Sequence, residues 1–82
     1  MKQIEWTEPA RADIRRLDRA TAMRIFEGLR RFMETDEGDV KLLKTSDPKE
    51  YRLRIGDYRV RFQAVGNTLQ ILRVLHRSEA YR

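Results

Sequence analysis

The sequence carries a dense group of arginines within residues 51–62, YRLRIGDYRVRF. They alternate with other residues on either side of a short Gly-Asp step: Arg52, Arg54, Arg59 and Arg61. Guanidinium groups stay charged at any physiological pH and can hold two phosphate oxygens at once. Like charges that face each other across two strands destabilise a sheet, by about 0.2–1 kcal/mol per pair. We therefore interpret the group as an anion site, with phosphate as the expected ligand.

The same arginines allow a plainer interpretation, in which they form a solvated surface or a patch for an acidic protein partner. The distribution of charge bears on this choice. The net charge is +5, and residues 1–48 hold ten basic and ten acidic side chains. Residues 49–82 hold eight basic and three acidic side chains, and so carry the whole excess. A neutral half joined to a basic half favours a surface that faces a polyanion, with nucleic acid as the first candidate.

Composition narrows the class of protein. A chain of 82 residues is expected to form one domain, here residues 1–82, with a thin core. The absence of cysteine excludes disulfides and thiolate metal sites, and with a single histidine we expect no metal or other cofactor. The N-terminus has no apolar signal segment, and no apolar run reaches the length of a membrane span. We expect a soluble, cytoplasmic protein.

The elements that must position the arginines follow from periodicity. Residues 2–6 read as a short strand, and Thr7 and Asp18 are expected to cap two helices, the second running to about Glu34. The apolar stripe of that helix is expected in the core: Ala22, Met23, Ile25, Phe26, Leu29, Phe32 and Met33. Residues 35–50 read as a loop that Leu42 and Leu43 anchor to the core. Three strands are predicted to follow, over 51–55, 58–65 and 68–75.

The fold class expected from this order is α+β, a β-α-α-β-β-β chain with a two-helix hairpin on one face of an antiparallel sheet. A two-residue turn at Gly56-Asp57 fixes the register of its hairpin. It pairs Ile55 with Tyr58, Leu53 with Val60 and Tyr51 with Phe62 towards the helices. Arg54 then pairs with Arg59, and Arg52 with Arg61, on the opposite face.

The second turn, Val65-Gly66-Asn67-Thr68, extends the sheet. Continued regularly, its register sets Val65, Gln63, Arg61 and Arg59 opposite Thr68, Gln70, Leu72 and Val74, on the arginine face. Arg73 then points towards the helices, unless it reaches out at an edge or a bulge shifts the register.

The register also predicts which side chains are buried against Phe26 and Leu29: Tyr51, Leu53, Ile55, Val60, Phe62, Leu69 and Ile71. Phe26→Ala is accordingly expected to cost roughly 3–5 kcal/mol. Trp6 could stack on a nucleic-acid base, but its place at the end of a strand beside the helices favours a core role.

Three segments together resemble the RelE/ParE superfamily of toxins from bacterial toxin–antitoxin pairs: WTEPARADIRRL, YRLRIGDYRVRF and VLHRSEAYR. The resemblance covers nearly the whole chain. It implies a RelE-type, ribosome-dependent mRNA endonuclease with the ribosome, mRNA and a cognate antitoxin protein as partners. A ParE-type relative would instead poison DNA gyrase, and a non-toxic fold-mate would only bind RNA.

The resemblance also implies site residues. Arg52 and Arg54 match basic strand positions that are lysines in the type member of the superfamily. Arg59 matches the arginine after the turn, Arg77 is the best match for a late arginine, and Tyr81 matches a tyrosine near the C-terminus. The phosphate-binding set predicted from charge and resemblance together comprises Arg52, Arg54, Arg59, Arg61 and Lys44.

RNA can be cut without a metal when its 2′-hydroxyl attacks the neighbouring phosphate. This reaction needs a base at the 2′-oxygen, cations on the non-bridging oxygens and an acid at the leaving 5′-oxygen. Arg54, Arg59 and Arg77 could hold the phosphate, and Tyr81, among cations that favour its ionised form, could be the base. His76, the only histidine, is a rival acid or base, and a polar strand-end role is its alternative.

Overall fold

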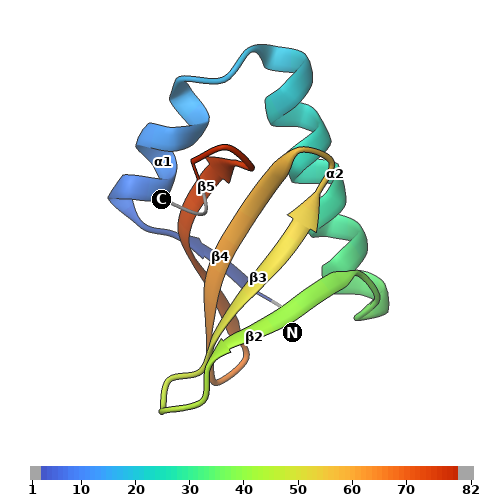
Figure 1. The fold of residues 1–82 in the computed structure, drawn as a ribbon. Helices are drawn as coiled ribbons and strands as arrows, with labels where there is room; N and C mark the ends of the chain where they lie inside the picture. Colours follow the sequence, from blue (N-terminus) through green and yellow to red (C-terminus); the bar gives the residue numbers. More distant parts are fainter. Residues whose placement is uncertain (1–2, 80–82) are drawn as a thin grey trace.

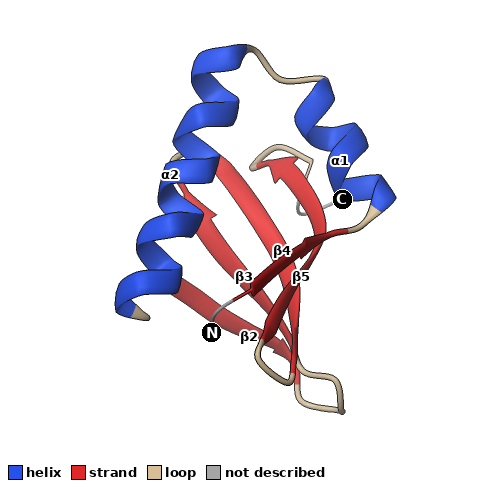
Figure 2. Cartoon of the chain, turned by 180° about the vertical axis from the view of Figure 1, so that it is seen from behind, coloured by secondary structure: helices blue, strands red, loops and turns tan. Residues whose placement is uncertain are grey.

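A computed structural model describes residues 3–79 (Figure 1). Its elements are β1 (Gln3–Trp6), α1 (Glu8–Arg15), α2 (Arg19–Thr35), β2 (Asp39–Lys44), β3 (Glu50–Ile55), β4 (Tyr58–Val65) and β5 (Thr68–His76). The strands form one sheet in the order β1-β5-β4-β3-β2, with β1 parallel to β5 and the other neighbours antiparallel. Both helices lie on the same side of this sheet (Figure 2). Neither described helix is long and apolar enough to span a membrane. The predicted α+β class and element order are confirmed, with one strand more than expected.

The additional strand is β2, so the prediction of a loop over residues 35–50 is wrong for Asp39–Lys44. This strand pairs with β3 at the edge of the sheet, and its register shifts between Leu42 and Lys44. Leu42 and Leu43 are 44% and 47% exposed, so they do not anchor the segment in the core. An edge strand with an irregular register shows no clean alternation in its sequence, because little of it has to match a buried face.

The predicted helix starts are confirmed in detail. The Thr7 hydroxyl accepts from the backbone N–H of Ala10 and itself donates to the carbonyl of Ile71 at 2.7 Å. Asp18 caps α2 by accepting from the backbone N–H of Thr21. The helix ends at Thr35, and its C-cap residue Asp36 has a left-handed backbone and donates its N–H to the carbonyl of Phe32 at 2.8 Å.

Helix α2 lies close to β3, because Gly28 presents no side chain there. A Cβ atom at this position would stand only 2.7 Å from Cδ1 of Ile55. The buried residues of α2 form a narrow stripe: Ile25, Leu29 and Phe32. Met23 and Phe26 were expected in the core, but they are 57% and 40% exposed, so this expectation is wrong.

Phe26 instead packs edge-to-face on Trp6, with ring centroids 5.6 Å apart. Trp6 is partly buried against the core, as its predicted core role required. The aromatic pair covers the end of β1 rather than the centre of the sheet. The predicted cost of Phe26→Ala, roughly 3–5 kcal/mol, is too large for a side chain in this position.

The core lies between the two helices and the centre of the sheet. Five of the seven predicted sheet residues are almost completely buried: Leu53, Val60, Phe62, Leu69 and Ile71. Tyr51 and Ile55 are partly buried and pack against the same cluster. The Phe62 ring stacks on Tyr51 at 5.3 Å and lies 5.8 Å from Phe32, so it joins the sheet to the helix.

The two hairpins differ in regularity. Every predicted pair of the β3–β4 hairpin is confirmed. The β4–β5 hairpin begins as predicted, but a bulge interrupts the register between Arg61 and Phe62. Phe62 stands opposite Ile71 and Arg61 opposite Arg73, so Leu72 is the extra residue.

The bulge exchanges the faces of the following residues. Val74, expected on the arginine face, stands opposite Val60 and is buried with 4% exposure. The predicted pairs of Arg61 with Leu72 and Arg59 with Val74 are therefore wrong. The alternative of a bulge near Arg73 is confirmed.

Candidate nucleic-acid interface

The side of the sheet away from the helices carries arginines from three strands, and we call it the arginine face. By register its arginines are Arg52 and Arg54 of β3, Arg59 and Arg61 of β4, and Arg73 of β5. Their accessibility is uneven. The side chains of Arg54 and Arg61 are 48% and 41% exposed, whereas that of Arg52 is 17% exposed and Arg59 as a residue is 6% exposed. The face is thus partly solvated and partly built into the protein.

Two carboxylates offset the repulsion between these arginines. Asp39 of β2 approaches Arg52 at 3.4 Å and Arg54 at 3.9 Å. Glu50, which is 7% exposed, accepts from Nε of Arg61 at 2.8 Å and from its Nη2 at 2.5 Å. The pair of Arg61 and Glu50 is the tighter of the two contacts, and it orients a guanidinium on the arginine face.

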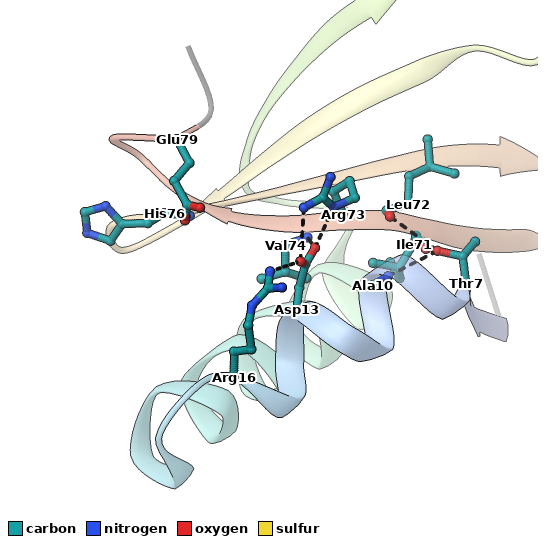
Figure 3. A network of polar contacts seen from close by, with 10 residues as sticks. All are labelled: Thr7, Ala10, Asp13, Arg16, Ile71, Leu72, Arg73, Val74, His76 and Glu79. Carbon is teal, nitrogen blue, oxygen red and sulfur yellow. Dashed lines mark hydrogen bonds and ion pairs between the residues drawn. The ribbon is translucent and has the colours of Figure 1, made fainter. Parts of the chain in front are cut away.

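A third carboxylate, Asp13 of α1, holds Arg73 (Figure 3). Its Oδ2 accepts from Nε of Arg73 and from the backbone N–H of Val74, both at 2.8 Å. Its Oδ1 accepts from Nη2 of Arg73 at 3.1 Å and from Nη2 of Arg16 at 2.6 Å. In the described sheet, β1 pairs with β5 only as far as Ile71. At the open edge of β5 beyond this residue, the Asp13 carboxylate accepts the backbone N–H of Val74, as a neighbouring strand would do.

Burial opposes ionisation of Asp13, but the hydrogen bonds from Arg73 and the N–H of Val74, with the nearby positive charges, outweigh it. The pKa of Asp13 is therefore held below its ordinary value of 3.8. The reciprocal bond raises the pKa of Arg73. Both groups are charged at any physiological pH, so the contact is a permanent ion pair.

His76 lies on the helix side of the sheet, because the bulge changes its face. It stands opposite Tyr58, and the two rings meet edge-to-face at 5.3 Å. Its Nδ1 is 2.9 Å from Oγ of Ser78. It also lines a cleft of about 230 Å³ together with Arg24 and Asp57. The structure thus separates His76 from the arginine face.

The remaining predicted site residues lie at the two ends of the sheet. Arg77, with its side chain 61% exposed, stands beside the β3–β4 turn, where its N–H donates to the carbonyl of Asp57 at 2.7 Å. Lys44 stands at the other end, opposite Glu50. The structure therefore brings Arg77 near Arg54 and Arg59 but leaves Lys44 apart from them. Tyr81 lies outside the described residues.

Two residues of this interface were not predicted from the sequence. Asp13 was not identified as a site residue, and Arg73 was not assigned to the arginine face. Ala10, Ile14 and Leu17 mark the buried side of α1, and Asp13 falls on that side, where a carboxylate must have a partner. This signal was available in the sequence. The position of Arg73 was not, because it depends on the bulge.

The described part of the interface supplies fixed cations. Among residues 3–79, no group of three or more acidic or histidine side chains could hold a metal ion. Guanidinium groups bind and neutralise phosphate but are poor proton donors at neutral pH. The arginine face can therefore bind a polyanion and stabilise charge on it.

The sequence matches a model of a known protein family. The family model of the ParE toxin of type II toxin–antitoxin systems (parDE) matches residues 4–81. The fold is similar to that of a chain in the archaeal RelE–RelB complex from Pyrococcus horikoshii OT3, with a TM-score of 0.77 and 24% identity over 96% of this chain and 98% of that chain. A chain of the RelBE2 toxin–antitoxin complex from Mycobacterium tuberculosis gives a TM-score of 0.71 and 26% identity over 92% and 96%.

The isolated RelE toxin of E. coli is similar as well, with a TM-score of 0.71 and 22% identity over 99% of this chain and 92% of that chain. No curated protein matches the sequence significantly. The likeness to solved structures covers both chains almost completely in each case, so the compared proteins share one whole fold.

Proposed function

We propose that this chain, which belongs to the ParE toxin family of type II toxin–antitoxin systems, is an endoribonuclease that cuts mRNA on the ribosome. The observation that carries the proposal is the direct opposition of Arg54 and Arg59 on the arginine face. Such a pair costs stability by itself, and a phosphate bound at Arg54, whose side chain is 48% exposed, would offset the repulsion while the 6% exposed Arg59 adds its charge from below. Arg77, beside the β3–β4 turn at the same end of the sheet, is the third cation assigned to the phosphate.

The proposed reaction needs no metal. The 2′-oxygen of RNA forms a bond to the adjacent phosphorus as the bond from phosphorus to the 5′-oxygen breaks. Tyr81, assigned through the resemblance to the superfamily, takes the 2′-hydroxyl proton, and the departing 5′-oxygen is protonated from water. Arg54 and Arg59 stabilise the negative charge that builds on the phosphate. The products are a 2′,3′-cyclic phosphate and a 5′-hydroxyl end.

The partner proposed for the free toxin is an antitoxin protein, as the toxin–antitoxin complexes among the similar structures suggest. An apolar groove of about 270 Å³ lies between α1 and α2, lined by Trp6, Ile14 and Phe26 and bordered by Arg11 and Arg15. An amphipathic segment with acidic residues at its margins would fit this groove. Binding that weakens as salt rises would point to the arginines, and binding indifferent to salt would point to the apolar lining.

The nuclease is tested with purified toxin, ribosomes and a short mRNA, with the chemistry of the new RNA ends as the readout. Cyclic phosphate ends are expected with the wild type. Tyr81→Phe keeps the ring and should lose roughly 10²–10⁴-fold in cleavage rate, the usual range for acid–base catalysis. His76→Gln should have a mild effect, because His76 lies on the helix side of the sheet. An active Tyr81→Phe beside an inactive His76→Gln would transfer the role to the histidine.

A second candidate function is inhibition of DNA gyrase, which the ParE name of the matching family favours. A gyrase inhibitor needs a docking surface and no phosphate chemistry. A supercoiling assay with purified gyrase separates the two candidates. Intact mRNA together with lost supercoiling would replace the nuclease proposal with this one.

A further inference from the structure

Four cationic side chains stand directly opposite one another on four neighbouring strands. The register pairs Lys41 of β2 with Arg52 of β3, Arg52 with Arg61 of β4, and Arg61 with Arg73 of β5. We call these four residues the cation row. Neighbouring strands lie about 4.8 Å apart, so the outer Cα positions of the row are about 14 Å apart. Each step of the row sets two like charges face to face, which costs stability.

The flanking rows of the same face are mixed in character. Towards the β3–β4 turn the register sets Asp39, Arg54, Arg59 and Leu75 in a row. On the other side it sets Lys44, Glu50, Gln63 and Gln70 in a row. Within the described sheet, the cation row is thus a single file of one charge between two rows that contain acids and neutral side chains.

Each arginine of the row has a carboxylate at its side: Asp39 for Arg52, Glu50 for Arg61 and Asp13 for Arg73. Arg61 and Arg73 each use Nε and Nη2 in this contact. A guanidinium has five N–H donors, so three remain in each case. The side chains of Arg61 and Arg73 are 41% and 40% exposed. The carboxylates therefore fix the direction of the guanidinium groups of Arg61 and Arg73 and leave their other donors for a ligand.

We propose that the cation row is a track for the sugar–phosphate backbone of a single-stranded nucleic acid, which crosses the sheet at right angles to its strands. Lys41 and Arg73 are the two ends of the track. A chain with one charge at every repeat matches a single file of cations, whereas an acidic protein surface would also meet the mixed rows. The proposal rests on the RNA-binding part of the proposed function and extends it by two residues.

The track also relates binding to cleavage. Arg54 and Arg59 stand two residues along their strands from Arg52 and Arg61, which is about 7 Å. A backbone held on the track therefore passes beside the pair that grips the scissile phosphate. Binding along the row would hold the RNA while Arg54 and Arg59 act on one phosphate.

The probe for this track is a fluorescein-labelled 12-mer of 2′-deoxythymidine, which lacks the 2′-hydroxyl and cannot be cut by the proposed reaction. Its affinity for the free toxin is measured by fluorescence anisotropy at several salt concentrations. Lys41→Gln should weaken binding by about 3–10-fold and lower the salt slope by about 0.7, as expected for one lost phosphate contact. Lys41 is exposed on an edge strand, so the variant should fold normally.

The matched control is Lys49→Gln, which removes the same charge from an exposed lysine just before β3, outside the cation row. Its affinity should stay within about two-fold of the wild type. At the other end, Arg73→Lys keeps a charge beside Asp13 but loses the forked donors, and it should weaken binding by about two- to five-fold. Should Arg73→Lys unfold, the comparison of Lys41→Gln with Lys49→Gln decides alone.

Ribosome-dependent cleavage is measured on the same variants, which separates the two proposals. Equal affinities of Lys41→Gln and Lys49→Gln for the oligonucleotide, with cleavage intact in the wild type, would overturn the track alone. A wild type that neither binds the oligonucleotide nor cuts mRNA would overturn the track and the nuclease together. Loss of antitoxin affinity in Lys41→Gln, with oligonucleotide binding unchanged, would make the row a protein-docking surface and overturn the track.

Discussion

The helix-covered face of the sheet and the arginine face consist of alternate residues of the same strands, yet different forces hold them. On the covered face, Val60, Phe62 and Ile71 are at most 1% exposed and belong to the core cluster that both helices contribute to. On the arginine face, Arg54 and Arg61 keep nearly half of their side chains in solvent and rely on ion pairs. Burial stabilises the first face, whereas exposed ion pairs contribute little. Stability and the proposed chemistry should therefore respond to different substitutions.

The largest effect is expected in the covered face. Phe62→Ala removes a ring that contacts both Tyr51 and Phe32, and it should lower the free energy of unfolding by about 3–5 kcal/mol. Urea unfolding of the purified protein measures this loss. Gln63→Ala, its neighbour on the opposite face, is the control and should change stability by under about 1 kcal/mol. Equal losses in both variants would contradict the division of the sheet into two faces.

The next effect concerns the arginine face. Arg54→Gln should lower the rate of mRNA cleavage by about 10²–10³-fold, because it removes charge stabilisation from the transition state. Its free energy of unfolding should change by under about 1 kcal/mol, since the contact with Asp39 is long and solvated. Arg11→Gln on α1 removes the same charge elsewhere and should cleave normally. Unfolding of Arg54→Gln would show that the arginine face is structural.

A smaller loss is expected where the two faces meet at the edge of β5. Asp13→Asn removes the charge that Arg73 and Val74 contact, and it should cost about 2–3 kcal/mol at neutral pH. The folded-state pKa of Asp13 is depressed, so its stabilisation is present above the ordinary value of 3.8 and is lost as pH falls through the folded pKa. The difference in the free energy of unfolding between wild type and Asp13→Asn should shrink when unfolding is measured below pH 3.8. A difference that stays constant down to pH about 2 would exclude ionisation of Asp13 as its source.

The smallest effect sharpens the border of the core. Phe26 is 40% exposed and contacts Trp6 edge-to-face. Phe26→Ala should therefore cost only about 1 kcal/mol in thermal or urea unfolding. A cost near that of Phe62→Ala would restore Phe26 to the core, as the helical stripe alone predicted. If the apolar groove binds the antitoxin, the same variant should weaken that complex more than it weakens the fold.

The local sequence determined the register of the β3–β4 hairpin completely. Gly56 has φ 58°, which a glycine adopts without strain, and the two-residue turn leaves one register for β3 and β4. The helix caps at Thr7 and Asp18 are similarly local, since each bonds a backbone group three residues ahead. The opposed arginines followed from that register, and so did the phosphate-binding hypothesis.

Only the tertiary structure decided which face of the sheet each residue after Leu72 occupies. The bulge there buries Val74, brings Arg73 opposite Arg61 and moves His76 to the helix side. Asp13 lies 61 residues before Val74 and accepts its backbone N–H at the open edge of β5. A bond over that separation leaves no periodic trace in the sequence of either segment, because it depends on α1 lying along the strand after the chain has folded.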